Sequence, residues 1–370
     1  MTRNTTSLAT GRNASRRPKT AAKRDNSVLD VTVILLEAGY ASTAIGPIEV
    51  FHSSGVLWNA LRGETTAPRF SVRLASIDGS SVTSRSELGL TPHCAIDDIR
   101  KADIIILPAS GLEVQETIAR NTSLLPWLRQ WHKRGAYIAG ICSGAAYLAE
   151  AGLLDGREAT THWAVADAFR KRYPKVRWRP ELFVTEDNRI LCSGGVYSSI
   201  DLSLYLVEKF CGHKIALQCS QALLVSMPRS RQSGYAAVPI SRPHSDDKIC
   251  DAEDYLRIHF ADGVSIDDLA QRAGMSSRNF IRRFKAATGR LPRDYIQILR
   301  ISEARNLLEQ RVASIQTVCA RVGYDDIAFF RNIFKRHTAM TPTEYRSKFG
   351  QFNFDGIALP TENSSAEAAE

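Results

Sequence analysis

The last third of the chain contains the same pattern twice, and this repeat decides the fold of that region. Residues 276–295 read SSRNFIRRFKAATGRLPRDY, and residues 326–345 read DIAFFRNIFKRHTAMTPTEY. Identical residues recur fifty positions apart at Phe280 and Phe330, Phe284 and Phe334, Lys285 and Lys335, Thr288 and Thr338, Pro292 and Pro342, and Tyr295 and Tyr345. A repeat of this length indicates one supersecondary unit that is used twice.

The pattern of each unit predicts two short helices joined by a tight turn. Ser265 is a favourable N-cap for the first helix, and Gly274 can adopt the left-handed conformation that ends it. Ser276 or Ser277 then begins a second helix, whose inner face is predicted to comprise Phe280, Ile281, Phe284 and Ala287. A helix, a glycine turn and a basic second helix form the helix-turn-helix pattern, in which the second helix enters the major groove of DNA.

The outer faces of the two second helices carry the candidate DNA-binding residues. In chain order they are Ser277, Arg278, Asn279, Arg282, Arg283, Lys285, Arg331, Asn332 and Lys335. Arg282 is expected to reach a guanine edge, and Lys285 is expected to contact phosphate. The helix that begins at Pro292 spans about 25 Å. This length suits two recognition helices in successive major-groove turns, which lie about 34 Å apart.

The double unit, over roughly residues 246–349, resembles the DNA-binding domain of AraC/XylS-type transcriptional activators. The ending TPTEYR at residues 341–346 is part of the resemblance. The alternative is an all-helical bundle with basic surfaces. Two features of the second copy depart from the first: Ala339 replaces the helix-ending Gly289, and Asp325 and Asp326 precede the second recognition helix. We therefore expect the second helix to bind DNA less strongly than the first.

Charge is distributed unevenly over the 370 residues, whose formal net charge is +9. Residues 1–27 contain seven Lys or Arg and one Asp, and residues 242–350 contain nineteen basic and fourteen acidic residues. This pattern favours a basic DNA-binding domain beside a neutral partner domain. No apolar run approaches the roughly 20 residues of a membrane span. The seven cysteines form no CxxC pair, so we expect no disulfide framework, no metal site and no cofactor.

Residues 28–226 alternate between β-rich apolar runs and helical patterns. Strands are expected near residues 31–36, 70–75, 103–107 and 136–139, with helices at 45–61 and 124–133. This alternation predicts an α/β domain with a mainly parallel sheet covered by helices on both faces. The proline-containing stretch 227–247 is interpreted as a linker, and 248–349 as the all-α DNA-binding domain. Residues 1–27 and 350–370 are expected to be disordered tails.

A candidate reactive cysteine lies in the stretch AYIAGICSGA, residues 136–145. The pattern predicts a strand, a sharp turn and a helix, with the sulfur of Cys142 at the carboxyl edge of the sheet. This is the arrangement of a nucleophile elbow, and a helix N-terminus beside the thiol is expected to lower its pKa. The alternative is a small-residue turn that holds an inert, buried cysteine.

The elbow and the motifs that follow it resemble the ThiJ/PfpI group of the class I glutamine amidotransferase-like superfamily. These motifs are GLLDG at residues 152–156, ATTHW at 159–163 and SGG at 193–195. The resemblance implies a flavodoxin-like sandwich with His162 beside Cys142. Where that group often carries an acidic residue, this chain has Thr43. The departure argues against hydrolysis, because no third group orients a base or tunes the thiol.

The combination of the two domains resembles the GlxA-type branch of AraC/XylS regulators. It implies that the first domain senses a small metabolite, often a nitrogenous or cationic one. The residues expected to bind this effector are Cys142, Ser143, His162, Trp163 and Tyr197. The rings of Trp163, Tyr197 and Tyr40 offer faces for a cation, or they simply fill the core and the rim.

These features predict a sequence-specific, promoter-binding transcriptional regulator in the bacterial cytoplasm. We expect an activator that responds to a small-molecule effector, contacts RNA polymerase and can form a homodimer, and we do not expect an enzyme. One alternative is a cysteine-dependent amidase or isonitrile-hydratase-like enzyme that carries a DNA-binding module, with Cys142 and His162 as catalytic residues. Another is a redox sensor that uses Cys142.

Overall fold

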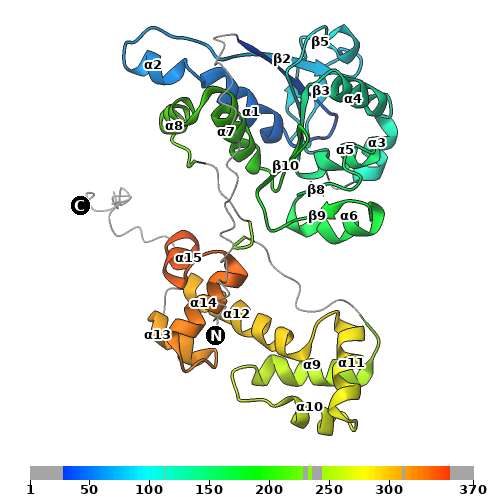
Figure 1. Cartoon of the computed structure of the whole chain (residues 1–370), viewed down its shortest axis with the longest axis vertical. Coiled ribbons are helices and arrows are strands. Elements are labelled where there is room, and N and C mark those ends of the chain that lie inside the picture. The colour runs from blue at the N-terminus through cyan, green and yellow to red at the C-terminus, as the bar shows by residue number, and fades with distance from the viewer. Residues whose placement is uncertain (1–27, 112, 228–231, 236–243, 311–312, 351–370) are drawn as a thin grey trace, which may run out of the picture.

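A computed structural model of the chain describes residues 28–111, 113–227, 232–235, 244–310 and 313–350. Within these ranges the chain forms an α/β domain followed by an all-helical domain (Figure 1). The predicted tail 1–27, nearly all of the predicted tail 350–370 and most of the predicted linker lie outside the described residues.

The α/β domain is built on a seven-stranded sheet, in the order β10-β11-β7-β6-β1-β2-β5. Its strands are β1 (Leu29–Ile34), β2 (Phe70–Ser76), β5 (Cys94–Ala95), β6 (Ile104–Leu107), β7 (Tyr137–Ile141), β10 (Val184–Asp187) and β11 (Ile190–Ser193). Each neighbouring pair is parallel except β10 and β11, which are antiparallel. Two small ribbons pair β3 (Val82–Thr83) with β4 (Gly89–Leu90), and β8 (Glu158–Ala159) with β9 (Arg177–Trp178).

Helices cover both faces of this sheet, as the sequence predicts for a flavodoxin-like sandwich (Figure 1). One face packs against α3 (Val114–Arg120), α4 (Leu124–Lys133), α5 (Ala145–Glu150) and α6 (Ala166–Arg172). The other packs against α1 (Ser42–Ser53), α7 (Ser198–Cys211) and α8 (His213–Ala222). The central strands contribute side chains to the hydrophobic cores on both faces of the sheet. In β6, Ile104 and Ile106 pack on one face, and Ile105 and Leu107 pack on the other.

The single helix predicted over residues 45–61 is wrong in one respect, since the chain breaks it into α1 and α2 (Leu57–Leu61). Gly55 lies between them with φ of +76°. A Cβ atom at this position would lie 2.2 Å from the carbonyl oxygen of Ala67. The glycine is therefore required for the turn.

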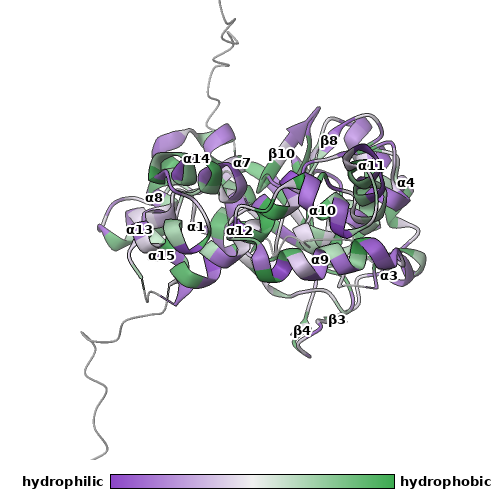
Figure 2. Cartoon of the chain, turned by 90° about the horizontal axis from the view of Figure 1, so that it is seen from below, coloured by the Kyte–Doolittle hydropathy of each residue, from purple (hydrophilic) through white to green (hydrophobic). Residues whose placement is uncertain are grey.

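The second domain consists of seven described helices, arranged as two helix-turn-helix units. They are α9 (Asp247–His259), α10 (Ile266–Arg272), α11 (Ser277–Thr288), α12 (Pro292–Glu309), α13 (Ile315–Arg321), α14 (Ile327–Thr338) and α15 (Pro342–Phe349). The predicted caps are confirmed: Ser265 accepts a hydrogen bond from the Asp268 amide, and Ser276 from the Asn279 amide. Each described helix of this domain has apolar and polar stretches, as its hydropathy colouring shows (Figure 2).

Each unit has its own hydrophobic core, and α12 belongs to both. Leu299 packs in the core of the first unit, and Ile301 and Leu308 pack in that of the second. The predicted inward orientation of Ile281 is wrong: its side chain is 37% exposed. The buried stripe of α11 is Phe280, Phe284 and Thr288, which recur every fourth residue. Within the described residues, no helix is long and apolar enough to cross a membrane.

The equivalent helix ends Gly289 and Ala339 allow a matched test of backbone strain. Both adopt the left-handed conformation, with φ of +81° and +61°. An alanine in this conformation costs about 1–2 kcal/mol. A glycine avoids this cost but loses more conformational entropy on folding, which offsets only part of the gain. We expect Ala339→Gly to stabilise the domain by about 0.5–1 kcal/mol and Gly289→Ala to destabilise it by a similar amount. Chemical denaturation followed by circular dichroism measures both, and a destabilised Ala339→Gly variant would refute the assignment.

Candidate effector site and DNA-binding face

Cys142 lies at the carboxyl end of β7, where the chain turns sharply into α5. Its φ is +55°, in the left-handed region that a non-glycine residue rarely adopts. Two glycines permit the turn: a Cβ at Gly140 would lie 2.9 Å from the Ala145 nitrogen, and one at Gly144 would lie 2.6 Å from two carbonyl oxygens. The predicted elbow is therefore present, at the edge of the sheet where α/β proteins bind ligands.

The thiol of Cys142 is not the activated nucleophile that the elbow suggests. Burial raises its pKa to about 11, although the backbone amides of Ser143 and His162 act in the opposite direction. The expectation that the helix N-terminus lowers this pKa is wrong, because desolvation of the thiolate outweighs the nearby amides. The side chain is a neutral thiol at neutral pH.

The backbone of His162 lies near the Cys142 thiol, and its imidazole ring has a backbone partner of its own. Its Nδ1 accepts a hydrogen bond from the Ala164 amide at 3.1 Å, so the neutral ring carries its proton on Nε2. Burial lowers the pKa of this imidazole, which favours the neutral form. The Nε2 edge lies along the backbone of Gly195, where a Cβ would approach Cδ2 to 3.4 Å. His162 therefore offers a hydrogen-bond donor at this edge.

Two polar residues near the elbow have structural contacts. The Ser143 side chain is buried, and its Oγ accepts a hydrogen bond from the Ser110 amide at 3.0 Å. Thr43 is also buried: its Oγ1 donates to the Tyr40 carbonyl at 2.6 Å and accepts from the Ala109 amide at 3.0 Å. Thr43 thus joins the loops that follow β1 and β6, and its hydroxyl supplies no acid or base.

The aromatic residues of the predicted site differ in their accessibility. Trp163 is half-buried and its ring lies 5.2 Å from that of His162, while Tyr197 is 69% exposed at the start of α7. Tyr40 already faces a cation, because the guanidinium of Arg85 lies 6.0 Å from its ring centre. Because Arg85 already supplies a cation to Tyr40, Trp163 and Tyr197 are the better candidates for a cationic ligand.

Buried hydroxyl groups of the α/β domain lack partners among the described residues. Ser193 ends β11 and pairs in register with Ile141, and its Oγ has no described hydrogen-bond partner. The same holds for Oγ of Ser199, in the first turn of α7. A buried hydroxyl without a partner is costly.

A hollow beside Tyr40 has a volume of only about 10 Å³, which is room for about one water molecule.

A contact that the sequence did not reveal is made by residues 232–235, which we term the bridging segment. The side chain of Gln232 is 2% exposed, and its Nε2 donates to the carbonyls of Thr161 and Leu182 at 2.9 and 3.0 Å. Thr161 in turn donates from Oγ1 to the Cys142 carbonyl at 2.9 Å. A Cβ at Gly194 would lie 2.6 Å from the Gln232 amide, so this glycine makes room for it.

The other end of the bridging segment packs on the second helix-turn-helix unit. The ring of Tyr235 lies 5.6 Å from that of Phe183 and 5.0 Å from that of Phe349, and so contacts both domains. Arg305 of α12 donates to the Gly234 carbonyl at 3.2 Å and to the Tyr345 hydroxyl at 2.8 Å. In Figure 1 the segment is the short green stretch between the domains. The predicted linker therefore includes a docked element.

Of the six predicted DNA-binding residues of α11, three are exposed and three are half-buried. Arg278, Arg282 and Lys285 are open to solvent. Half-buried Asn279 accepts a hydrogen bond from Arg282 at 2.9 Å, and half-buried Ser277 donates to Asp267. The Arg283 guanidinium pairs with Asp246 at 2.5 Å and holds α9 against α11. On α14, Arg331, Asn332 and Lys335 are all exposed.

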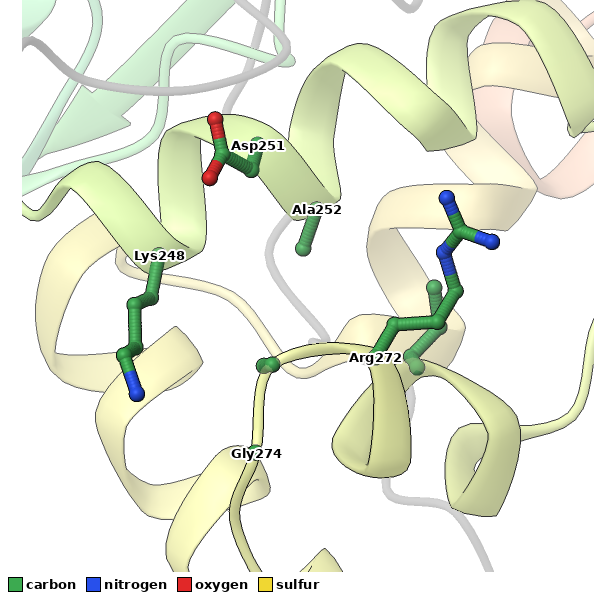
Figure 3. A pocket seen from close by; sticks show the side chains of 7 residues that line it. Lys248, Asp251, Ala252, Arg272 and Gly274 are labelled. Carbon is green, nitrogen blue, oxygen red and sulfur yellow. The ribbon is translucent and has the colours of Figure 1, made fainter.

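A surface groove of about 680 Å³ lies in the first helix-turn-helix unit, between α9 and α10 (Figure 3). It is lined by Lys248, Asp251, Ala252, Leu269, Arg272, Ala273 and Gly274. The Arg272 guanidinium stacks 3.9 Å from the centre of the Tyr255 ring. Charged, open and remote from the elbow, this groove suits solvent or DNA phosphates rather than the effector.

The described residues include one group that could offer metal ligands: His244, Cys250 and Glu253. Nε2 of His244 lies 2.8 Å from the buried Glu253 carboxylate, whereas the Cys250 sulfur lies on the opposite side of the ring, 3.7 Å from Nδ1. One ligand atom of each residue lies within 4.8 Å of the others, and in this structure Nε2 of His244 is hydrogen-bonded to Glu253. The arrangement is that of a hydrogen-bonded cluster at the start of α9.

The pKa of Cys142 leads to a direct prediction about reactivity. Because the thiolate is the reacting form, a pKa of about 11 should make alkylation at neutral pH roughly a hundredfold slower than that of a free cysteine. The rate should rise as the pH approaches 11. Iodoacetamide labelling, read by mass spectrometry of the peptide that contains Cys142, measures this, with Cys142→Ala as the blank. Labelling at the rate of a free thiol would instead restore the enzyme and redox alternatives.

Comparisons with known proteins agree with this architecture. A model of the DJ-1/PfpI family matches residues 33–209, and a model of a helix-turn-helix domain matches residues 269–348. The HTH-type transcriptional regulator CdhR of Pseudomonas aeruginosa is 29% identical over 84% of this chain and 88% of its own. The HTH-type transcriptional regulator GlxA of Rhizobium meliloti is 30% identical over 74% of this chain and 83% of its own.

Part of the chain is also similar to an enzyme. The isonitrile hydratase of Pseudomonas putida is 31% identical over 146 residues, which are 39% of this chain and 61% of that protein. The similarity to the regulators extends through both domains, and it confirms the resemblance found in the sequence. The chain belongs to the family of HTH-type transcriptional regulators that join a DJ-1/PfpI domain to an AraC-type DNA-binding domain.

Proposed function

We propose that a small metabolite binds beside Cys142 and His162 and changes how this transcriptional regulator engages its promoter. The observation that supports the proposal is the bridging segment, residues 232–235. Gln232 contacts the loop that carries His162, and Gly234 and Tyr235 contact the second helix-turn-helix unit. A change at the effector site therefore has a short, packed route to the DNA-binding domain.

The route consists of few contacts. The Thr161 hydroxyl binds the Cys142 carbonyl, and the Thr161 carbonyl binds Gln232. Two residues further on, the Gly234 carbonyl binds Arg305. Movement of the Thr161 backbone by an ångström would break the bond to Gln232, because the donor and acceptor are 2.9 Å apart. Coupling of this kind is typically worth about 1–3 kcal/mol.

The chemistry of the site favours a small polar effector that carries an acceptor group and a cationic nitrogen. A carboxylate can accept the Nε2 proton of neutral His162. A cationic nitrogen can face the ring of Trp163 or Tyr197. Amino acids, betaines and carnitine have this combination of groups.

The domain is proposed to sense rather than to catalyse. A nucleophilic cysteine needs a thiolate, a base and a group that orients the base. Here burial raises the pKa of the thiol, Nδ1 of His162 is bound to a backbone amide, and Thr43 stands at the acidic position. The similarity to the isonitrile hydratase keeps a cysteine-dependent enzyme as the second candidate.

Four further properties belong to the proposal as predictions. The protein acts as an activator and contacts RNA polymerase at the promoter. Its effector-responsive form is a homodimer, because paired half-sites are the usual targets of helix-turn-helix regulators. It works in the cytoplasm, where the bacterial chromosome lies.

A thermal-shift screen of amino acids, betaines and related amines on the full chain tests for the effector, because a specific ligand stabilises the folded protein. Variants then separate a sensor from an enzyme. We expect Cys142→Ala to retain effector-dependent reporter activation, because it removes one sulfur from an otherwise intact wall. His162→Ala or Trp163→Ala should bind promoter DNA but respond poorly, since each loses a large contact surface.

The enzyme alternative predicts the reverse ranking. A Cys142→Ala protein that binds DNA normally and fails to respond at any effector concentration would contradict the proposal. Turnover of an amide or isonitrile substrate by the wild type, lost in Cys142→Ala, would contradict it as well.

A further inference from the structure

The two recognition helices present different chemistry at equivalent positions. The positions that begin their outer faces are Arg278, Asn279 and Arg282 on α11, and Ala328, Phe329 and Asn332 on α14. The first set is cationic and polar. The second set has a methyl group and an aromatic ring in place of a guanidinium and an amide.

Phe329 is unusual for a surface position. Its side chain is 51% exposed, whereas the neighbouring Phe330 is fully buried in the core of the unit. The exposed ring is held from behind by Tyr324, whose centroid lies 5.9 Å away at an interplanar angle of 60°. Tyr324 is fixed in turn by Arg300, whose guanidinium lies 5.1 Å from its ring. The aromatic surface is therefore positioned before DNA arrives.

The cap of α14 places this ring at the DNA-facing end of the helix. Oδ1 of Asp326 accepts hydrogen bonds from the backbone amides of Ala328 and Phe329, at 2.7 and 3.2 Å. Ala328 and Phe329 therefore lie in the first turn, and side chains at the start of a recognition helix contact base edges. Asp326, which was expected to weaken DNA binding, is engaged in capping the helix.

We propose that α14 reads A·T base pairs, while α11 reads guanine. Apolar side chains such as Ala and Phe contact the C5 methyl group of thymine, and Asn forms a bidentate pair with adenine. Ala328 and Phe329 supply the first kind of contact and Asn332 the second. Arg331 and Lys335, both exposed on α14, supply positive charge for the flanking phosphates. The second helix is thus not a weaker copy of the first but reads different bases.

A competing explanation assigns Phe329 only to covering Tyr324. In that case the ring would affect stability and leave base preference unchanged. The two explanations differ in one measurable respect, the dependence of binding on the thymine methyl group.

The test begins with selection of randomised double-stranded DNA by the full-length protein at low salt, where phosphate contacts alone already give binding. We expect two blocks of preferred bases about one helical turn apart. Arg282→Ala should erase the guanine-containing block, and Phe329→Ala should relax the A·T-rich block. Each variant serves as the control for the other, and circular dichroism checks that both variants are folded.

Deoxyuracil, which lacks only the methyl group of thymine, then replaces single thymines in the A·T-rich block. Each methyl group that Phe329 or Ala328 contacts should contribute about fourfold to the affinity of the wild type. Phe329→Ala should be indifferent to the replacement at the position that Phe329 contacts. Wild-type binding that no uracil replacement weakens would overturn the proposal. So would a selection that enriches no A·T position dependent on residue 329.

Discussion

The buried side-chain amide of Gln232 is the interaction on which the arrangement of this regulator depends. It reaches the carbonyls of Thr161 and Leu182 in a space that only a glycine at position 194 leaves open. A buried amide without partners costs about 1–3 kcal/mol, so the segment stays docked while the loop around Thr161 keeps its position. The contacts that Gly234 and Tyr235 make with the DNA-binding domain therefore also depend on the position of the Thr161 loop.

The site and the DNA-binding domain have opposite physical characters, and this suits a sensor. At the elbow, burial keeps Cys142 and His162 neutral, so binding depends on shape, donors and ring faces. In the helix-turn-helix units, exposed cationic side chains and capped helix N-termini are placed to bind DNA, a charged polymer. The bridging segment joins these two environments through hydrogen bonds and ring contacts, and both are sensitive to small displacements.

Much of the fold could be predicted from the sequence, because it rests on periodic signals. The fifty-residue repeat identified both helix-turn-helix units, and alternating apolar runs identified the parallel sheet. The elbow at Cys142 followed from small residues at fixed spacing. The raised pKa of the thiol could not be predicted, since it depends on burial by distant elements. Nor could the role of Gln232, which is one polar residue in a proline-rich stretch, or the pairing of Arg283 with Asp246.

The central claim is that the effector site and the DNA-binding domain are coupled through Gln232. The most direct measurement is the effector response of Gln232→Ala at a reporter promoter, with Ser233→Ala, a change in the same segment, as the control. The account predicts that Gln232→Ala binds both effector and promoter DNA yet shows little or no effector-dependent change in activation, while Ser233→Ala responds normally. A full response from a folded Gln232→Ala protein would contradict it.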